Sequence, residues 1–149
     1  MANNINIKNK KAYRDFDIEE KLIAGIQLLG TEIKSIRKGK VSLAESWCYF
    51  DNGELYIKGM HVAEYALGTH SNHQPLRIRK LLLNRRELQK WEKKVNERGY
   101  TIIALRLFIS DAGYAKLEIG LARGKRQYDK RQDIKKKDLA RESERRIKL

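Results

Sequence analysis

Histidine and cysteine side chains are the groups of this chain best suited to acid–base, nucleophilic or metal chemistry. The histidines are His61, His70 and His73, and the single cysteine is Cys48. His70 and His73 could suggest a metal pair, but no cysteine or carboxylate cluster accompanies them, as zinc would require. The three histidines could also serve a nuclease as bases, yet no carboxylate partner is visible beside them. Cys48 lies in an aromatic run, which predicts a small buried hydrophobic side chain.

Sequence signatures of catalysis are otherwise absent. The chain has no G-x-S-x-G serine motif, no phosphate-binding G-x-x-x-x-G-K-[ST] loop and no G-x-G-x-x-G dinucleotide fingerprint. We therefore predict a binding protein that is not an enzyme, with no catalytic residue, no metal and no cofactor. A small metal-dependent nuclease that uses His73 is the enzymatic alternative.

The charge of the chain indicates a polyanionic partner. Its 33 Lys and Arg residues outnumber its 19 Asp and Glu residues and give a net charge of +14. Clustered cations bind nucleic acid by releasing condensed counterions. Basic residues recur in an N-terminal arm, a short helix, the run from Arg77 to Lys80 and the C-terminal tail, which predicts an extended footprint. RNA is favoured over DNA because no helix-turn-helix or zinc module is visible, and barrel surfaces suit irregular RNA.

Other features of the sequence predict a cytoplasmic protein with no membrane partner. A single cysteine cannot form an intramolecular disulfide. No apolar run reaches the roughly 18 residues of a membrane span, and the N-terminus lacks the apolar region of a secretory signal.

The first third of the chain predicts an arm, a strand and a short helix. Residues 1–14 are polar and basic, and we expect an extended arm that orders on a ligand. Residues 15–29 favour a long strand bent at Gly25. Thr31 is the expected N-cap of a helix over Glu32–Lys38, which closes at Gly39.

The middle and end of the chain predict further strands and one long helix. Asp51-Asn52-Gly53 is typical of a hairpin turn. Residues 61–80 predict a long functional loop that leads into a helix. Asn84 and Glu87 form a capping-box pattern for a helix over residues 84–98 that ends at Gly99, and two strands follow over residues 100–109 and 114–121.

These elements predict a mainly β fold with helices: an OB-like antiparallel β-barrel over residues 15–121 with one short and one long helix. Closure of so few strands removes their unpaired edges, and an open α+β sheet is the alternative. Residues 122–149 form a basic C-terminal tail with too few apolar residues to bury. We expect this tail to be disordered when free and helical on a nucleic-acid surface.

Several stretches, in this order along the chain, resemble the SsrA-binding protein family, also called small protein B. They are Asn9-Lys10-Lys11-Ala12, Ile18-Glu19-Glu20, Ala24-Gly25-Ile26, Gly30-Thr31-Glu32-Ile33-Lys34-Ser35, Asn72-His73-x-Pro75-Leu76-Arg77-x-Arg79-Lys80-Leu81-Leu82-Leu83, Arg86-Glu87-Leu88 and Ala122-Arg123-Gly124-Lys125-Arg126-Gln127-Tyr128-Asp129-Lys130-Arg131. The resemblance implies an RNA-binding adaptor of trans-translation. Its expected partners are the tRNA-like domain of transfer-messenger RNA (tmRNA), elongation factor Tu in the delivered complex, and the decoding centre and vacant mRNA channel of the ribosomal small subunit.

The resemblance and the basic runs together assign two sets of site residues. The expected RNA-binding residues are Asn9, Lys10, Lys11, Glu32, Lys34, Ser35, Arg37, Arg77, Arg79, Lys80 and Leu82. The expected ribosome-binding residues of the tail are Gly124, Lys125, Arg126, Tyr128, Asp129, Lys130 and Arg131.

Two positions depart from the family pattern, and one competing function stays open. Ile23 stands where relatives often carry glutamate, and Tyr128 stands where some carry histidine. Both rings at position 128 can stack on a base. The competing function is that of a basic protein which coats ribosomal RNA and shows no preference for a tRNA-like fold.

Overall fold

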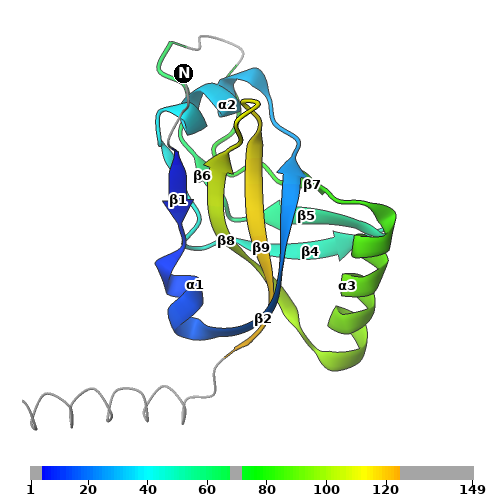
Figure 1. The fold of residues 1–149 in the computed structure, drawn as a ribbon. Coiled ribbons are helices and arrows are strands. Elements are labelled where there is room, and N and C mark those ends of the chain that lie inside the picture. Colours follow the sequence, from blue (N-terminus) through cyan, green and yellow to red (C-terminus); the bar gives the residue numbers. More distant parts are fainter. Residues whose placement is uncertain (1–4, 68–71, 125–149) are drawn as a thin grey trace, which may run out of the picture.

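The computed structural model describes residues 5–67 and 72–124. In chain order the elements are β1 (Asn6–Lys8), α1 (Lys10–Asp15), β2 (Phe16–Ile26), α2 (Gly30–Arg37), β3 (Val41–Ser42), β4 (Trp47–Asp51), β5 (Glu54–Lys58), β6 (His61–Val62), β7 (Arg79–Leu82), α3 (Arg85–Arg98), β8 (Thr101–Ile109) and β9 (Ala115–Gly124). Figure 1 shows β2, β8 and β9 as the long strands, with α2 at one end of them and α3 at one side. No helix in the described ranges is long and apolar enough to cross a membrane.

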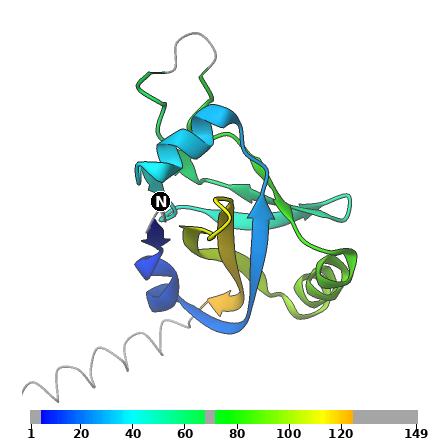
Figure 2. The ribbon, with the colours of Figure 1, turned by 45° about the horizontal axis from the view of Figure 1, so that its top comes forward.

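The main sheet closes on itself. Hydrogen-bonded neighbours run in the order β8-β4-β5-β7-β2-β9, and β9 pairs again with β8. Strands β4 and β1 pair with different parts of β8, at Ile102 and at Arg106–Phe108 respectively. Figure 2 shows the strands arranged around a common interior. Closure leaves few backbone groups unpaired at sheet edges, and the predicted mainly antiparallel β class is confirmed.

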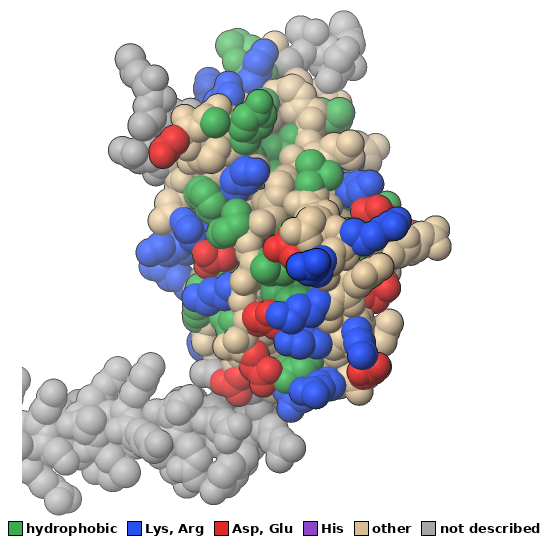
Figure 3. Space-filling view, turned by 45° about the vertical axis from the view of Figure 1, so that its right-hand side comes forward, with side chains coloured by type: hydrophobic (Ala, Val, Ile, Leu, Met, Phe, Trp, Pro, Cys, Tyr) green, Lys and Arg blue, Asp and Glu red, His purple; other side chains and the backbone are tan. Residues whose placement is uncertain are grey.

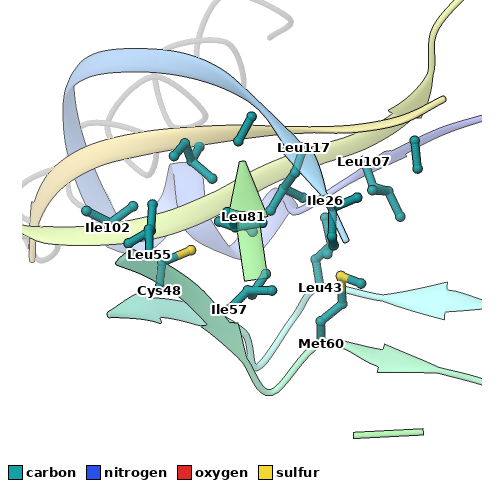
Figure 4. Packing of buried hydrophobic residues seen from close by; sticks show 14 of the residues in the cluster. Ile26, Leu43, Cys48, Leu55, Ile57, Met60, Leu81, Ile102, Leu107 and Leu117 are labelled. Atoms are coloured by element: carbon teal, nitrogen blue, oxygen red, sulfur yellow. The ribbon is translucent and has the colours of Figure 1, made fainter. Parts of the chain in front are cut away.

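The interior of this ring is the hydrophobic core. Leu55 and Ile57 of β5 point toward Leu81, Leu107 and Leu117 from the other strands (Figure 4). All five are 0 % exposed. The strand predicted over residues 114–121 is confirmed as β9, and its Ala115, Leu117, Ile119 and Leu121 are all buried on one face. The core therefore follows the period of two that a half-buried strand requires.

The turn and the long helix that the sequence predicts are confirmed. Asn52 and Gly53 connect β4 to β5 with positive φ angles of 51° and 77°. The Asn84 side chain accepts a 2.8 Å hydrogen bond from the Glu87 N–H at the start of α3. Gly99 ends α3 in the left-handed conformation, and Trp91 is fully buried against the core.

The arm predicted over residues 1–14 is not extended throughout, because residues 10–14 belong to helix α1 and only residues 6–8 are extended, as strand β1. Asn9 is 5 % exposed and Ala12 is 3 % exposed. The Asn9 side-chain amide donates hydrogen bonds to the carbonyls of Leu43, at 3.2 Å, and Ala104, at 2.9 Å. These partners lie far along the chain, so local composition could not reveal them. The described residues thus contain three helices where two were predicted.

Other local details also differ from the predictions. Helix α2 begins at Gly30, and the Leu29 N–H donates to Glu32 Oε1 at 2.8 Å, so Thr31 is not the cap. Residues 79–82 form β7, not the entry of a helix, because β5 and β2 bind them from both sides. Strand β2 has a register shift between Ile18 and Glu20, which the sequence did not indicate, and its pairing with β9 is regular at Gly25. Strand β9 continues past Leu121 to Gly124, and Ala122 is fully buried.

Candidate nucleic-acid interface

A hollow of about 350 Å³ lies beside α2, at the end of the ring opposite the end of β9. The loop before α2 contributes Leu28 and Leu29, β7 contributes Leu82, and the β8–β9 turn contributes Tyr114. Three of these side chains are substantially exposed: Leu29 at 48 %, Leu82 at 50 % and Tyr114 at 68 %. Apolar side chains that remain this open next to one another mark a binding surface more than a core.

The charge of this hollow is positive. Arg37 and Lys116 line it, and none of its described lining residues is acidic. Elsewhere the charges are mixed: on the face in Figure 3, Asp and Glu side chains lie between the Lys and Arg side chains. An apolar floor with two cations and no lining carboxylate suits an unpaired nucleotide, whose base stacks and whose phosphates need positive charge.

A glycine lies under Leu82 at one wall of the hollow. Gly25 of β2 pairs with Leu82 of β7. A Cβ atom added at Gly25 would lie 3.2 Å from Leu82 Cβ, so a side chain there would crowd Leu82. The glycine lets Leu82 lie close to β2.

A buried ionic cluster links α2 to β7. Glu32 and Arg79 are both 0 % exposed and form an ion pair. Arg77 Nη2 donates to Glu32 Oε1 at 2.6 Å, and Arg79 Nη1 donates to the Met60 carbonyl at 2.8 Å. Burial alone would raise the pKa of Glu32, but hydrogen bonds from Arg77, the Leu29 N–H and Arg79 outweigh it and lower the pKa. Glu32 is therefore held as a carboxylate inside the protein.

The cation face of α2 lies beside an aromatic ring. Lys34 Nζ and Lys38 Nζ each lie 5.4 Å from the centre of the Tyr65 ring. Lys34 and Arg37 of α2 and Lys38 and Lys40 just after it are exposed, and Ile36 is fully buried. The helix thus presents several cations that are available to phosphates.

The structure divides the predicted RNA-binding residues into exposed and buried groups. The exposed or half-buried residues are Lys10, Lys11, Lys34, Arg37, Arg77, Lys80 and Leu82, and the buried residues are Asn9, Glu32, Ser35 and Arg79. The buried side chains contact other residues of the protein and are not accessible to a partner. Lys10 and Lys11 belong to α1, which Figure 1 places toward the other end of the ring from α2. Of the predicted tail residues, Gly124 ends β9, and Lys125, Arg126 and Tyr128–Arg131 lie outside the described residues.

Sequence reasoning missed Tyr114 and Lys116 as members of the hollow. Tyr114 lies in the turn between β8 and β9 and Lys116 lies at the start of β9, and only the ring closure brings that turn beside α2. The high exposure of the Tyr114 ring can be seen only in the folded structure. A tyrosine next to a glycine-containing turn is the weak signal that the sequence offered.

The described histidine with resolved hydrogen bonds, His73, binds other groups of the protein itself. His73 is buried, with its Nε2 at 2.9 Å from the Val62 carbonyl and its Nδ1 at 2.9 Å from Thr31 Oγ1. Because the carbonyl can only accept, Nε2 donates, and Nδ1 accepts from the Thr31 hydroxyl. No group of three potential metal ligands occurs among the described residues, and His70 lies outside them.

Comparison with known proteins places these features in a family context. Residues 6–149 match the family model described as SmpB protein. The chain is 57 % identical over 147 residues to an SsrA-binding protein of Christiangramia forsetii, covering 99 % of this chain and 91 % of that protein. It is 47 % identical over 142 residues to an SsrA-binding protein of Geobacter sulfurreducens, covering 95 % and 92 %. A chain from the solved structure "tmRNA-SmpB: a journey to the center of the bacterial ribosome" matches with a TM-score of 0.70 and 41 % identity, covering 87 % of this chain and 94 % of that one.

Proposed function

We propose, from the premise that this chain belongs to the SmpB protein family, that it acts with tmRNA in trans-translation on the ribosome. It is a noncatalytic RNA-binding adaptor of the bacterial cytoplasm. The observation that carries this proposal is the open, carboxylate-free hollow beside α2 in a chain of net charge +14.

The body binds the tRNA-like domain of tmRNA in this proposal. The ring of strands is an OB-like barrel, and its α2 end carries the RNA-binding surface. Leu82 and Tyr114 contact bases, and Arg37 and Lys116 contact phosphates. Glu32 and Arg79, which were predicted as RNA contacts, instead position α2 and β7, because their buried groups bind one another.

The tail acts on the ribosome. The residues after Gly124 occupy the decoding centre and the empty mRNA channel in place of codon–anticodon pairing, and become helical there, after elongation factor Tu has helped deliver the complex. Strand β9 supports this two-part arrangement, because it ends at the opposite end of the ring from the hollow. A single body could therefore face the RNA with one end and the ribosome with the other.

A competition experiment tests the body's function. Labelled tRNA-like domain of tmRNA is bound to the full chain and challenged with unlabelled tRNA-like domain or a ribosomal RNA hairpin of equal length. We expect the unlabelled domain to compete at least tenfold better. Equal competition would instead support the general rRNA-coating function.

A truncation tests the two-part arrangement. A chain that ends at Gly124 keeps all of β9 and should bind the tRNA-like domain as the full chain does, but fail to support tagging of stalled nascent chains. A large loss of RNA affinity on truncation would contradict the separation of body and tail.

A further inference from the structure

We infer that Arg123, Tyr100 and Glu19 form a clamp that fixes the direction in which the chain leaves the body at Gly124. These three residues are called the exit clamp below. The inference rests on the proposed function of the tail and adds positioning residues for it. None of the three was among the predicted site residues.

The need for a clamp follows from how β9 ends. The pairing of β9 with β8 stops at Ala122, which lies opposite Thr101. The pairing with β2 continues, with Arg123 opposite Asp17 and Gly124 opposite Phe16. The last two residues of β9 therefore have a backbone partner on one side only, and such strand ends open easily.

A side-chain contact between Arg123 and Tyr100 takes the place of the missing pairing with β8. The Arg123 guanidinium carbon lies 4.3 Å from the centre of the Tyr100 ring. Tyr100 directly precedes β8, so it stands where the next residue of that strand would have paired. A guanidinium that stacks on an aromatic face is attracted by the ring quadrupole, so this contact holds Arg123 beside Tyr100.

Tyr100 is itself held in place. It is 6 % exposed, and its hydroxyl donates a 2.5 Å hydrogen bond to Glu19 Oε2. This bond links the residue before β8 to β2, the strand on the other side of β9. The Tyr100 ring is thus a fixed surface for Arg123.

A bulge in β2 provides this bond. Ile18 pairs with Ala122 and Glu20 pairs with Leu121, which leaves Glu19 as the extra residue. Bulges redirect side chains and are retained for that purpose. Glu19 turns to Tyr100, while the next carboxylate, Glu20, receives Lys90 Nζ at 2.8 Å and Lys94 Nζ at 2.7 Å from α3. The Ile18-Glu19-Glu20 stretch therefore serves the end of β9.

The direction set at Gly124 limits what the following residues can reach. An extended chain advances at most about 3.6 Å per residue, so Tyr128 cannot lie more than about 14 Å from Gly124. A change of direction at Gly124 would change the starting point of the residues that follow it. A fixed exit direction reduces the conformational freedom that the tail loses when it binds the ribosome.

A mutant cycle tests the exit clamp against direct RNA contact by Arg123. The variants are Arg123→Ala, Tyr100→Leu and their combination in the full chain, with Tyr100→Phe to remove only the hydroxyl. Arg86→Ala, an exposed arginine of α3, controls for the loss of one positive charge. Tagging of stalled nascent chains, affinity for the tRNA-like domain, and hydrogen exchange of residues 120–124 are measured for each.

We expect each clamp variant to reduce tagging about tenfold with RNA affinity within twofold of wild type, and the double variant to lose no more than either single variant. Exchange at residues 122–124 should rise in the same variants, and Arg86→Ala should change nothing.

Additive losses, or a Tyr100→Leu variant with wild-type tagging and exchange, would overturn the clamp. If Tyr100→Leu fails to fold, the tagging and exchange of Arg123→Ala and Tyr100→Phe alone test the exit clamp. A wild-type chain without tagging activity would overturn the proposed function, and exchange would still report on the clamp.

Discussion

Glu32 of α2 and Arg79 of β7 meet as an ion pair with both side chains fully buried. The pair joins the helix that presents cations to the strand that presents Leu82. Burial lowers the pKa of Arg79, and the pair with Glu32 opposes that shift. The position of the exposed surface around the hollow therefore depends on the buried charges of Glu32 and Arg79, which no partner can contact.

Removal of the buried carboxylate should destabilise the whole protein. Glu32→Gln leaves Arg79 buried without its counter-ion, which should lower the free energy of unfolding by about 3–5 kcal/mol. Urea denaturation followed by circular dichroism measures this change. Glu54→Gln is the matched control, because its 3.6 Å pair with Lys80 is partly exposed and is worth less than about 1 kcal/mol. Equal effects of the two variants would contradict the structural role of Glu32.

Loss of the exposed aromatic ring should weaken RNA binding without loss of stability. Tyr114→Ala removes a stacking surface worth about 1–3 kcal/mol, so the Kd for the tRNA-like domain should rise roughly 5- to 150-fold. The melting temperature should stay unchanged, since Tyr114 is 68 % exposed. Tyr13→Ala, at an exposed tyrosine of α1, should leave the Kd unchanged. An unchanged Kd for Tyr114→Ala would remove this ring from the interface.

The cations of the hollow should appear in the salt dependence of binding. Arg37→Gln and Lys116→Gln should each reduce the slope of log K against log salt by about 0.7–0.9, as expected for one lost phosphate contact. Titration at several salt concentrations measures the slope. Lys58→Gln, at an exposed lysine of β5 outside the hollow, should not alter it. A slope that responds equally to all three changes would indicate a diffuse electrostatic contact.

Glu20 should contribute stability that acid removes. Hydrogen bonds from Lys90 and then Lys94 lower the pKa of Glu20 from 4.5 to about 2. Because the folded pKa lies below the unfolded one, the contribution is complete above pH 4.5 and falls as pH drops toward 2. The pair is partly exposed, so the contribution is about 1 kcal/mol or less. Glu20→Gln should lower the free energy of unfolding at pH 7 and match wild type near pH 2. A difference that is independent of pH would contradict this role.

The fold class and several element boundaries were predictable because their signals are local. Strand β9 alternates apolar and polar residues, and α3 carries Asn84, Glu87 and Gly99 where a helix needs its caps. The Asn52-Gly53 turn requires positive φ angles that these residues adopt most readily. Each signal lies within a few residues of the structure that it specifies.

The sequence by itself also determined the binding chemistry, since net charge, the lack of catalytic motifs and the ordered family stretches are properties of the chain alone. Only the tertiary structure decided which of those residues a partner can reach. The sequence predicted Glu32 and Arg79 as RNA contacts, but in the folded protein they are buried against one another. Tyr114 was not predicted, and it joins the hollow because the closed ring brings the β8–β9 turn beside α2. Burial is a sum over neighbours distant in sequence, so local pattern does not contain it.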